Sequence, residues 1–88
     1  MAYKIAYTRR FEKNYKKLTS SEKRQIKTKV EILSENPFHP SLRTKRIQGT
    51  DDLFECSVNM DIRIIWYHEG DQLIMLLDVG HHDILERF

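Results

Sequence analysis

Residues 73–77 read Leu73-Ile74-Met75-Leu76-Leu77, an unbroken apolar run. Consecutive apolar residues are typical of a strand that is central in a sheet or covered on both faces. The chain ends as Gly80-His81-His82-Asp83-Ile84-Leu85-Glu86-Arg87-Phe88, so two imidazoles follow the point where a buried strand should reach the surface. Imidazole titrates near neutral pH, and this placement therefore predicts a proton-transfer group.

The segments before this run predict an antiparallel meander. Residues 53–58 and 62–67 read as strands, 72–79 as the last strand, and 43–47 as a possible short strand. Alternation puts Phe54, Cys56 and Val58 on one face of the sheet. In the next strand it puts the Arg63 side chain with those of Asp61, Ile65 and Tyr67.

The N-terminal half predicts a strand and a helical hairpin. Residues 2–7 read as the strand, Thr8 as the cap of a first helix, and Thr19-Ser20-Ser21-Glu22 as the capping box of a second helix that ends before Pro37. Their apolar stripes are Phe11, Tyr15 and Leu18, then Ile26, Val30 and Leu33. We therefore expect one α+β domain over residues 1–88, with a helical hairpin covering one face of the sheet.

Charge is distributed unevenly along the chain. Residues 1–48 hold 13 Lys/Arg and 4 Asp/Glu (+9), whereas residues 49–88 hold 2 and 9 (−7). This asymmetry indicates a polyanionic partner for the first half, although each lysine alone is explained by a solvated helix face. The sequence shows no membrane span and no signal peptide, so we expect a cytoplasmic location. The single cysteine, Cys56, is expected to be a core residue.

Arg63 stands in an otherwise apolar strand. A charge is costly to bury without a partner, so Arg63 requires either an ion pair with Asp61 or Glu55, or an exposed face. In the second case its guanidinium could clamp a phosphate. Arg43, Lys45 and Arg46 lie just upstream and form a plausible RNA-backbone surface, or an edge strand protected by charge.

His82 is the leading acid/base candidate and His81 the second; His39 and His68 are expected at the surface. No spacing in the sequence matches a metal site, and no cofactor is expected. Cleavage of a phosphodiester needs a proton acceptor, a proton donor and cations. His82, a carboxylate of Glu55 or Asp61, and Arg63 with Lys45 or Arg46 could fill these roles, while Phe88 could stack on a base.

The order of these features resembles the RelE/ParE superfamily of bacterial toxins over essentially the whole chain. The resemblance rests on the opening strand, the basic helical hairpin, Arg46-Ile47-Gln48-Gly49, Ile62-Arg63-Ile64-Ile65-Trp66-Tyr67 and Val79-Gly80-His81-His82. It implies a RelE-like, microbial-ribonuclease-like fold and a toxin of a type II toxin–antitoxin pair. Such toxins are most often endoribonucleases that cut mRNA in the ribosomal A site, and a cognate antitoxin blocks their active surface.

Under this resemblance, Arg63 falls where RelE-type enzymes keep a catalytic arginine. His82 falls where relatives place a catalytic arginine or histidine, and in the YafQ-like branch that residue is a histidine. Asp61 matches a functional aspartate of the same branch. Phe88 aligns with a C-terminal tyrosine of RelE and lacks its hydroxyl, so it could stack but not transfer a proton.

Three positions depart from one or both of these patterns. Glu55 and Ser57 stand where RelE carries two lysines, Ser57 also replaces a YafQ-like histidine, and Lys45 replaces another. The ParE branch shares the fold but poisons DNA gyrase, and it generally lacks the acid/base set. His82 and Arg63 together favour the ribonuclease; a gyrase inhibitor, or a catalytically weak member that acts through its antitoxin complex, is the alternative.

Overall fold

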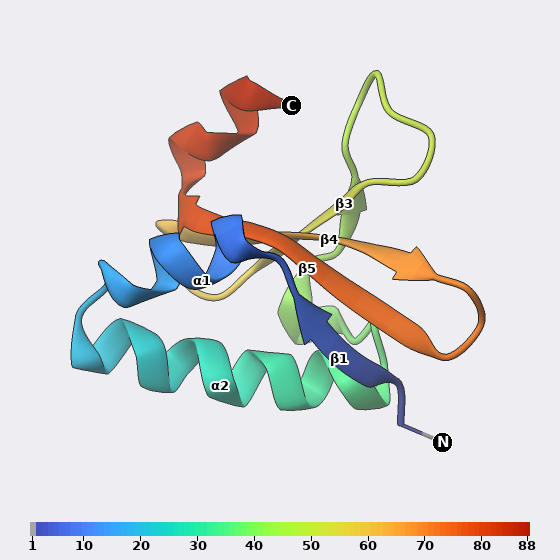
Figure 1. Ribbon diagram of the computed structural model, residues 1–88, viewed down its shortest axis with the longest axis horizontal. Helices are drawn as coiled ribbons and strands as arrows, with labels where there is room; N and C mark the ends of the chain where they lie inside the picture. Colours follow the sequence, from blue (N-terminus) through green and yellow to red (C-terminus); the bar gives the residue numbers. More distant parts are fainter. Residues whose placement is uncertain (1) are drawn as a thin grey trace.

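The computed structural model describes residues 2–88 as one mixed sheet flanked by helices (Figure 1). Its elements are β1 (Lys4–Tyr7), α1 (Arg9–Lys16), α2 (Ser20–Glu35), the 3-10 turn η1 (Pro40–Leu42), β2 (Lys45–Arg46), β3 (Phe54–Ser57), β4 (Ile62–Glu69), β5 (Leu73–His81) and the 3-10 segment η2 (His82–Arg87). The α+β class and the predicted order of elements are confirmed. Among the described residues, no helix is long and apolar enough to traverse a bilayer.

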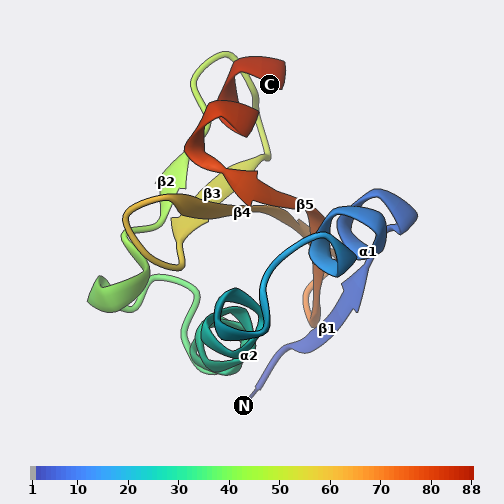
Figure 2. The ribbon, with the colours of Figure 1, turned by 90° about the vertical axis from the view of Figure 1, so that its left-hand side faces the viewer.

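The five strands lie in the order β1-β5-β4-β3-β2. Strands β2 to β5 form the predicted antiparallel meander, whereas β1 pairs in parallel with β5, from Lys4 opposite Leu73 to Tyr7 opposite Leu76. The apolar run is therefore central in the sheet, as its composition predicted. Figure 2 shows α2 on one face of the sheet and the C-terminal segment on the other, so both faces of β5 are covered.

Local sequence signals explain both helix starts. The Thr8 hydroxyl accepts a hydrogen bond from the Phe11 backbone N–H at 3.1 Å. At α2, the Thr19 hydroxyl accepts from the Glu22 N–H at 3.1 Å while the Glu22 carboxylate accepts from the Thr19 N–H at 2.9 Å. This reciprocal pair is the predicted capping box, and it satisfies donors that a helix start would otherwise leave unpaired.

Two apolar clusters lie on opposite faces of the sheet. The larger one packs the helices against the sheet, and the smaller one packs η2 and the loop after β2 against the other face. Their buried members are Phe11, Ile26, Leu33, Leu42, Cys56, Val58, Ile62, Ile64, Trp66, Ile74, Leu76 and Val79, then Ile47, Ile65 and Ile84. Because Ile62 and Ile64 belong to the helix-side cluster, Arg63 lies on the face of Ile65, as alternation predicted.

Several boundaries differ from the sequence-based expectation. Strand β2 has only two residues, β4 runs to Glu69, and β5 continues through His81. The extra length of β5 arises because Ile62 pairs with His81 and Arg63 with Gly80. Pairing of this kind depends on the partner strand, which local sequence does not reveal.

Candidate functional site

Arg63 is held by the backbone of the turn that precedes its own strand. Its Nη1 donates to the carbonyl oxygens of Asn59 at 2.8 Å, Met60 at 3.1 Å and Ile62 at 3.2 Å. Within the described residues, Nη2 and Nε have no hydrogen-bond acceptor. One side of the guanidinium is thus fixed, and the other is available to a ligand.

The ion pair considered for Arg63 is not formed. Among the described side chains, the salt bridges join Arg10 to Asp78 and His81 to Glu22, and neither Asp61 nor Glu55 pairs with Arg63. The interpretation of Arg63 as a purely structural ion-pair residue is therefore wrong. Its positive charge stays uncompensated by protein carboxylates on a half-buried surface.

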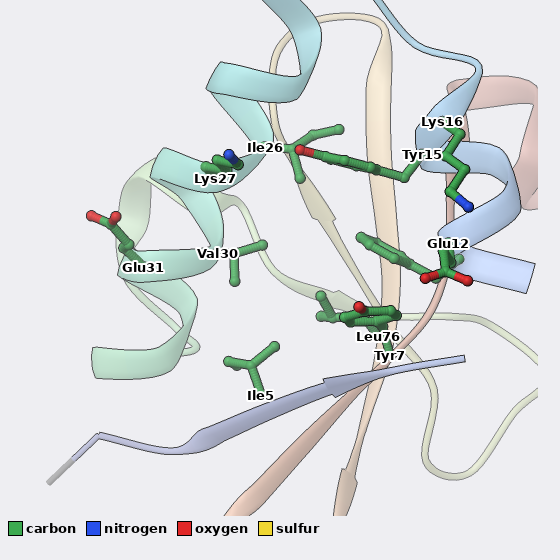
Figure 3. Close-up of a pocket in the computed structure, with 11 residues that line it drawn as sticks. Ile5, Tyr7, Glu12, Tyr15, Lys16, Ile26, Lys27, Val30, Glu31 and Leu76 are labelled. Atoms are coloured by element: carbon green, nitrogen blue, oxygen red, sulfur yellow. The ribbon is translucent and has the colours of Figure 1, made fainter. Parts of the chain in front are cut away.

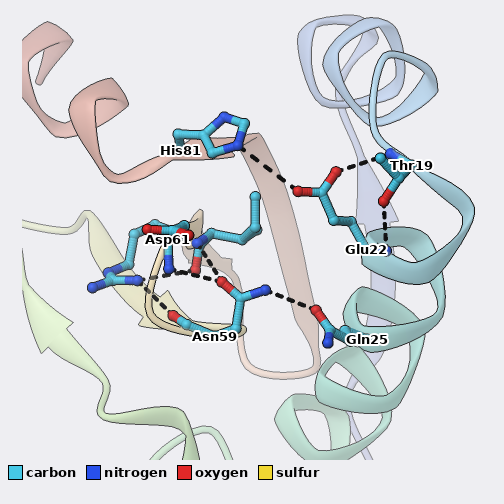
Figure 4. Close-up of polar contacts among 8 residues, drawn as sticks. Thr19, Glu22, Gln25, Asn59, Asp61 and His81 are labelled. Carbon is cyan, nitrogen blue, oxygen red and sulfur yellow. Dashed lines mark hydrogen bonds and ion pairs between the residues drawn. The ribbon is translucent and has the colours of Figure 1, made fainter.

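The turn that holds Arg63 is shaped by Asn59. Its Oδ1 accepts hydrogen bonds from the N–H groups of Asp61 and Ile62, both at 2.8 Å. Its Nδ2 donates to Oε1 of Gln25 at 2.7 Å, which ties the turn to α2 (Figure 4). Asp61 itself is exposed and lies in this turn.

His82 is exposed and begins η2, directly after β5. The backbone of His82 is positioned by the end of β5, where Gly80 pairs with Arg63 across the sheet. A Cβ at Gly80 would stand 2.6 Å from Cγ2 of the buried Ile84, so η2 packs this closely only because residue 80 has no side chain. His82 thus follows, by two residues, the strand partner of Arg63.

His81 points to the other face of the sheet. Its Nε2 lies 3.8 Å from Oε2 of Glu22, in the direction of α2 (Figure 4). The pKa of Glu22 is lowered from its usual value, chiefly by the hydrogen bond from the Thr19 backbone and to a smaller extent by His81. The structure thus separates the two neighbouring histidines, with His81 at the helix cap.

The basic residues of β2 also divide between the two faces. Lys45 pairs with Glu55, and Ser57 with Arg63, so these four residues share one face. Arg46 pairs with Phe54 instead, and its guanidinium carbon lies 5.6 Å from the Phe54 ring centroid.

The aromatic cluster beside Arg46 includes His68. It is half-buried, with its ring 5.5 Å from Tyr3 and 5.2 Å from Trp66. Our expectation that His68 is a simple surface residue is therefore wrong. His39 is exposed, as expected, and caps η1 by accepting from the Ser41 N–H.

The C-terminal aromatic ring is partly covered by a residue that the sequence did not single out. The Arg10 guanidinium carbon lies 5.4 Å from the centroid of the half-buried Phe88 ring. The same Arg10 reaches Oδ2 of the fully buried Asp78 at 3.3 Å, and Asn14 Nδ2 donates to Asp78 Oδ1 at 2.6 Å. One ring face of Phe88 is thus occupied by a cation.

A cavity of about 340 Å³ adjoins Arg63, and we call it the Lys29 pocket. Its lining consists of Lys29, Ser41, Arg43, Ser57, Val58, Asn59, Met60 and Arg63. Lys29 was missed in the sequence, although a signal exists: Ile26, Lys29 and Leu33 recur at helical spacing, which puts a lysine on the buried stripe. The Nζ of Lys29 lies 3.4 Å from the Ser41 carbonyl oxygen.

Comparison with known protein families gives one match, to the model of YafQ, a bacterial toxin of type II toxin–antitoxin systems, over residues 3–87. The chain belongs to the YafQ toxin family. No curated protein matches the sequence.

Solved structures share the fold of this YafQ-family chain. YafQ from E. coli strain BL21(DE3) is 20% identical, with a TM-score of 0.77 over 94% of this chain and 97% of that one. The archaeal RelE–RelB complex from Pyrococcus horikoshii OT3 is 21% identical, with a TM-score of 0.77 over 92% and 96%. The E. coli DinJ–YafQ complex is 20% identical, with a TM-score of 0.77 over 97% and 98%.

The YafQ-family chain has a second, larger cavity (Figure 3), and Arg63 is not among the residues that line it. This groove of about 550 Å³ separates α1, α2 and β1; its floor is apolar, and charged side chains stand at its edges. The lining is Ile5, Tyr7, Phe11, Glu12, Tyr15, Lys16, Ile26, Lys27, Val30, Glu31 and Leu76. None of the predicted site residues lines this groove, whereas Arg43 and Arg63 line the smaller pocket.

Cys56 of this family member is a core residue, as predicted. It is 1% exposed, and burial raises the pKa of its thiol to about 12. Over residues 2–88 there is no group of three or more His, Cys, Asp or Glu side chains suited to hold a metal ion.

Proposed function

We propose that this type II toxin is an endoribonuclease that cleaves mRNA at the ribosomal A site without a metal ion. The proposal is carried by Arg63, whose guanidinium is anchored on one side and unpaired with any described carboxylate. It shares a sheet face with Lys45 and Glu55, and its strand partner Gly80 lies two residues before His82.

The proposed reaction is an internal displacement at phosphorus. The 2′-hydroxyl loses its proton and attacks, the P–O5′ bond breaks, and the 5′-oxygen takes up a proton. This leaves a 2′,3′-cyclic phosphate and a 5′-hydroxyl. Arg63 offsets the charge that builds on the phosphoryl oxygens in the transition state.

His82 is the proposed proton-transfer group, because it is exposed just after the strand that pairs with Arg63 and because imidazole exchanges protons near neutral pH. Glu55 is the better placed of the two carboxylates, since it shares the face of Arg63. Asp61 lies in the adjacent turn and would assist from there. Lys45 would hold the RNA backbone on this face.

The other predicted RNA contacts occupy the margins of the site. Phe88 packs against the smaller apolar cluster and lies beneath Arg10, so it would stack on a base with the exposed part of its ring. His81 and Arg46 face the helix side of the sheet and would contact RNA only where it wraps around an edge. Arg43 lies in the Lys29 pocket.

Primer extension on a defined mRNA tests the activity. Wild-type protein, His82→Ala and Arg63→Ala are compared with and without ribosomes. Cuts within codons that require ribosomes, His82 and Arg63, and that leave 2′,3′-cyclic phosphate ends, are expected. Folded wild-type protein that is toxic in cells but cuts no RNA would contradict the proposal and direct attention to DNA gyrase.

We also propose a cognate antitoxin as the protein partner. The solved relatives include a RelE–RelB complex and a DinJ–YafQ complex. Co-expression with the product of a small adjacent reading frame should abolish growth inhibition and yield a stable complex on co-purification. Persistent toxicity, with no complex formed, would argue against that partner.

A further inference from the structure

Three cations from separate elements line the Lys29 pocket. Lys29 comes from α2, Arg43 follows η1, and Arg63 comes from β4. No Asp or Glu lines this cavity, and in the described chain none lies within 4.0 Å of these three charges. Like charges in a partly enclosed space repel one another, so an anion bound between them is favoured.

The pocket holds its cations without neutralising them. Nζ of Lys29 approaches the Ser41 carbonyl oxygen, and Arg63 is anchored to carbonyl oxygens of its turn. Both contacts orient the side chains while their full charges remain for a ligand. Preorganised donors of this kind bind anions at little cost in side-chain entropy.

Arg43 occupies a backbone conformation that disfavours an arginine. Its φ of 50° is in the left-handed region, and it is the one non-glycine residue with positive φ among those described. Glycine or asparagine fits such a position with less strain. Strain at a charged, pocket-lining residue is typical of a binding site.

The pocket's remaining polar lining suits phosphate oxygens. Ser41 and Ser57 supply hydroxyl groups, and the cavity volume of about 340 Å³ is within the range of about 300–1,000 Å³ for small-ligand sites. A guanidinium matches phosphate oxygens as a fork, and a lysine adds a point charge. Arg63 borders both this pocket and the proposed cleavage site.

From this arrangement we infer that the Lys29 pocket binds a phosphate of the RNA backbone adjacent to the one that is cleaved. The inference rests on the proposed function. Lys29, Arg43 and the Ser41 hydroxyl hold that neighbouring phosphate and thereby fix the register of the strand over Arg63 and His82. Lys29 and Arg43 are assigned as positioning residues for the substrate.

Binding of an uncleavable RNA tests this inference without relying on catalysis. A short fluorescent oligoribonucleotide with 2′-O-methyl groups is titrated at several salt concentrations into wild-type protein, Lys29→Gln and Arg43→Asn. Asparagine tolerates the left-handed conformation at position 43. Each substitution is expected to raise Kd about three- to tenfold and to lower the salt slope by about 0.7.

Lys27→Gln is the matched control. Lys27 is on the same helix and loses the same charge, but it lines the apolar groove. We expect it to change Kd less than twofold. Equal effects of Lys27→Gln and Lys29→Gln, or no RNA binding by wild-type protein, would overturn the inference.

Two further probes separate the possible sources of the anion. Inorganic phosphate that binds the pocket as tightly as the oligonucleotide would indicate a free-phosphate site instead. A glutamate-rich peptide that binds with the same Lys29 dependence would indicate an acidic protein segment. Cleavage that fails while Lys29-dependent RNA binding persists would contradict the proposed nuclease, and the pocket would then bind a backbone phosphate without positioning a cleavage site.

Discussion

The side-chain amide of Asn59 donates to Gln25 at 2.7 Å, so the turn before β4 is tied to the middle of α2. The same Asn59 residue caps two backbone N–H groups of the turn and accepts from Arg63 through its carbonyl oxygen. The orientation of Arg63 therefore depends on a polar contact between the sheet and the helical layer.

Replacement of Asn59 by alanine should slow RNA cleavage about 10–100-fold, because a small misplacement of a reacting group has effects of this size. The measurement is the rate constant for cleavage at saturating substrate, because Arg63 would keep its charge but lose its orientation. Gln25→Ala, which removes only the helix contact, should have a smaller effect. Cleavage by Asn59→Ala at the wild-type rate would show that the turn does not orient Arg63.

Replacement of Gly80 by alanine should displace η2 and His82. The new Cβ would meet Ile84 at 2.6 Å, and overpacking of this kind costs about 1–3 kcal/mol of unfolding free energy. Cleavage should fall further than stability alone explains. The double variant Gly80→Ala/Ile84→Ala removes the clash. Its gain in cleavage rate over Gly80→Ala should exceed the loss that Ile84→Ala alone causes relative to wild type. A double variant that cleaves no faster than Gly80→Ala would refute this account of His82 placement.

Replacement of Arg43 by glycine should stabilise the fold by about 0.5–1 kcal/mol. Glycine relieves the strain of a positive φ, and part of this gain is offset because glycine loses more conformational entropy on folding. RNA binding should weaken in the same variant. Urea unfolding and RNA titration measure the two effects. A variant that is both less stable and weaker in binding would show that Arg43 supports the fold.

Stability should fall above pH 9 because of Cys56. The pKa of its thiol is about 12 in the folded protein against 9.0 for the free group, because burial disfavours the thiolate. Deprotonation then stabilises only the unfolded chain, so the free energy of unfolding decreases from about pH 9 towards pH 12. Urea midpoints of wild-type protein should decline more steeply over this range than those of Cys56→Ala, and parallel profiles would contradict the prediction.

Acid should weaken the start of α2 through Glu22. Its pKa is lowered below 4.5, chiefly by the Thr19 backbone hydrogen bond, so its contribution is present above pH 4.5 and is lost as the carboxylate is protonated. Thermal midpoints of wild-type protein should fall more between pH 5 and pH 3 than those of Glu22→Gln. Equal losses would show that the cap does not depend on this charge.

The local features of the fold could be read from the sequence. Thr8 and Thr19 cap helices through residues three positions away, and strand alternation alone placed Arg63 on the correct face. Such features depend on short-range geometry. The parallel pairing of β1 with β5 could not be read, because it joins Lys4 to Leu73 with no local signal.

The candidate site was predictable as a set of residues but not as an arrangement. His81 and His82 are adjacent in sequence, and only the end of β5 decides that His81 turns toward Glu22. Arg46 was grouped with Lys45, although strand alternation places neighbouring side chains on opposite faces. Lys29 joins Arg63 only through the packing of α2 beside η1.

The parallel pairing of β1 with β5 also bears on how the protein is made. Strand β1 is synthesised before the other described elements, and its partner β5 is the last of the five strands to leave the ribosome. Until then β1 lacks the neighbour that fixes it, and the Arg63 strand lacks β5 as well. A nascent chain that has not yet released β5 therefore cannot carry the finished sheet, and any partner that recognises the completed sheet can act only after β5 has left the ribosome.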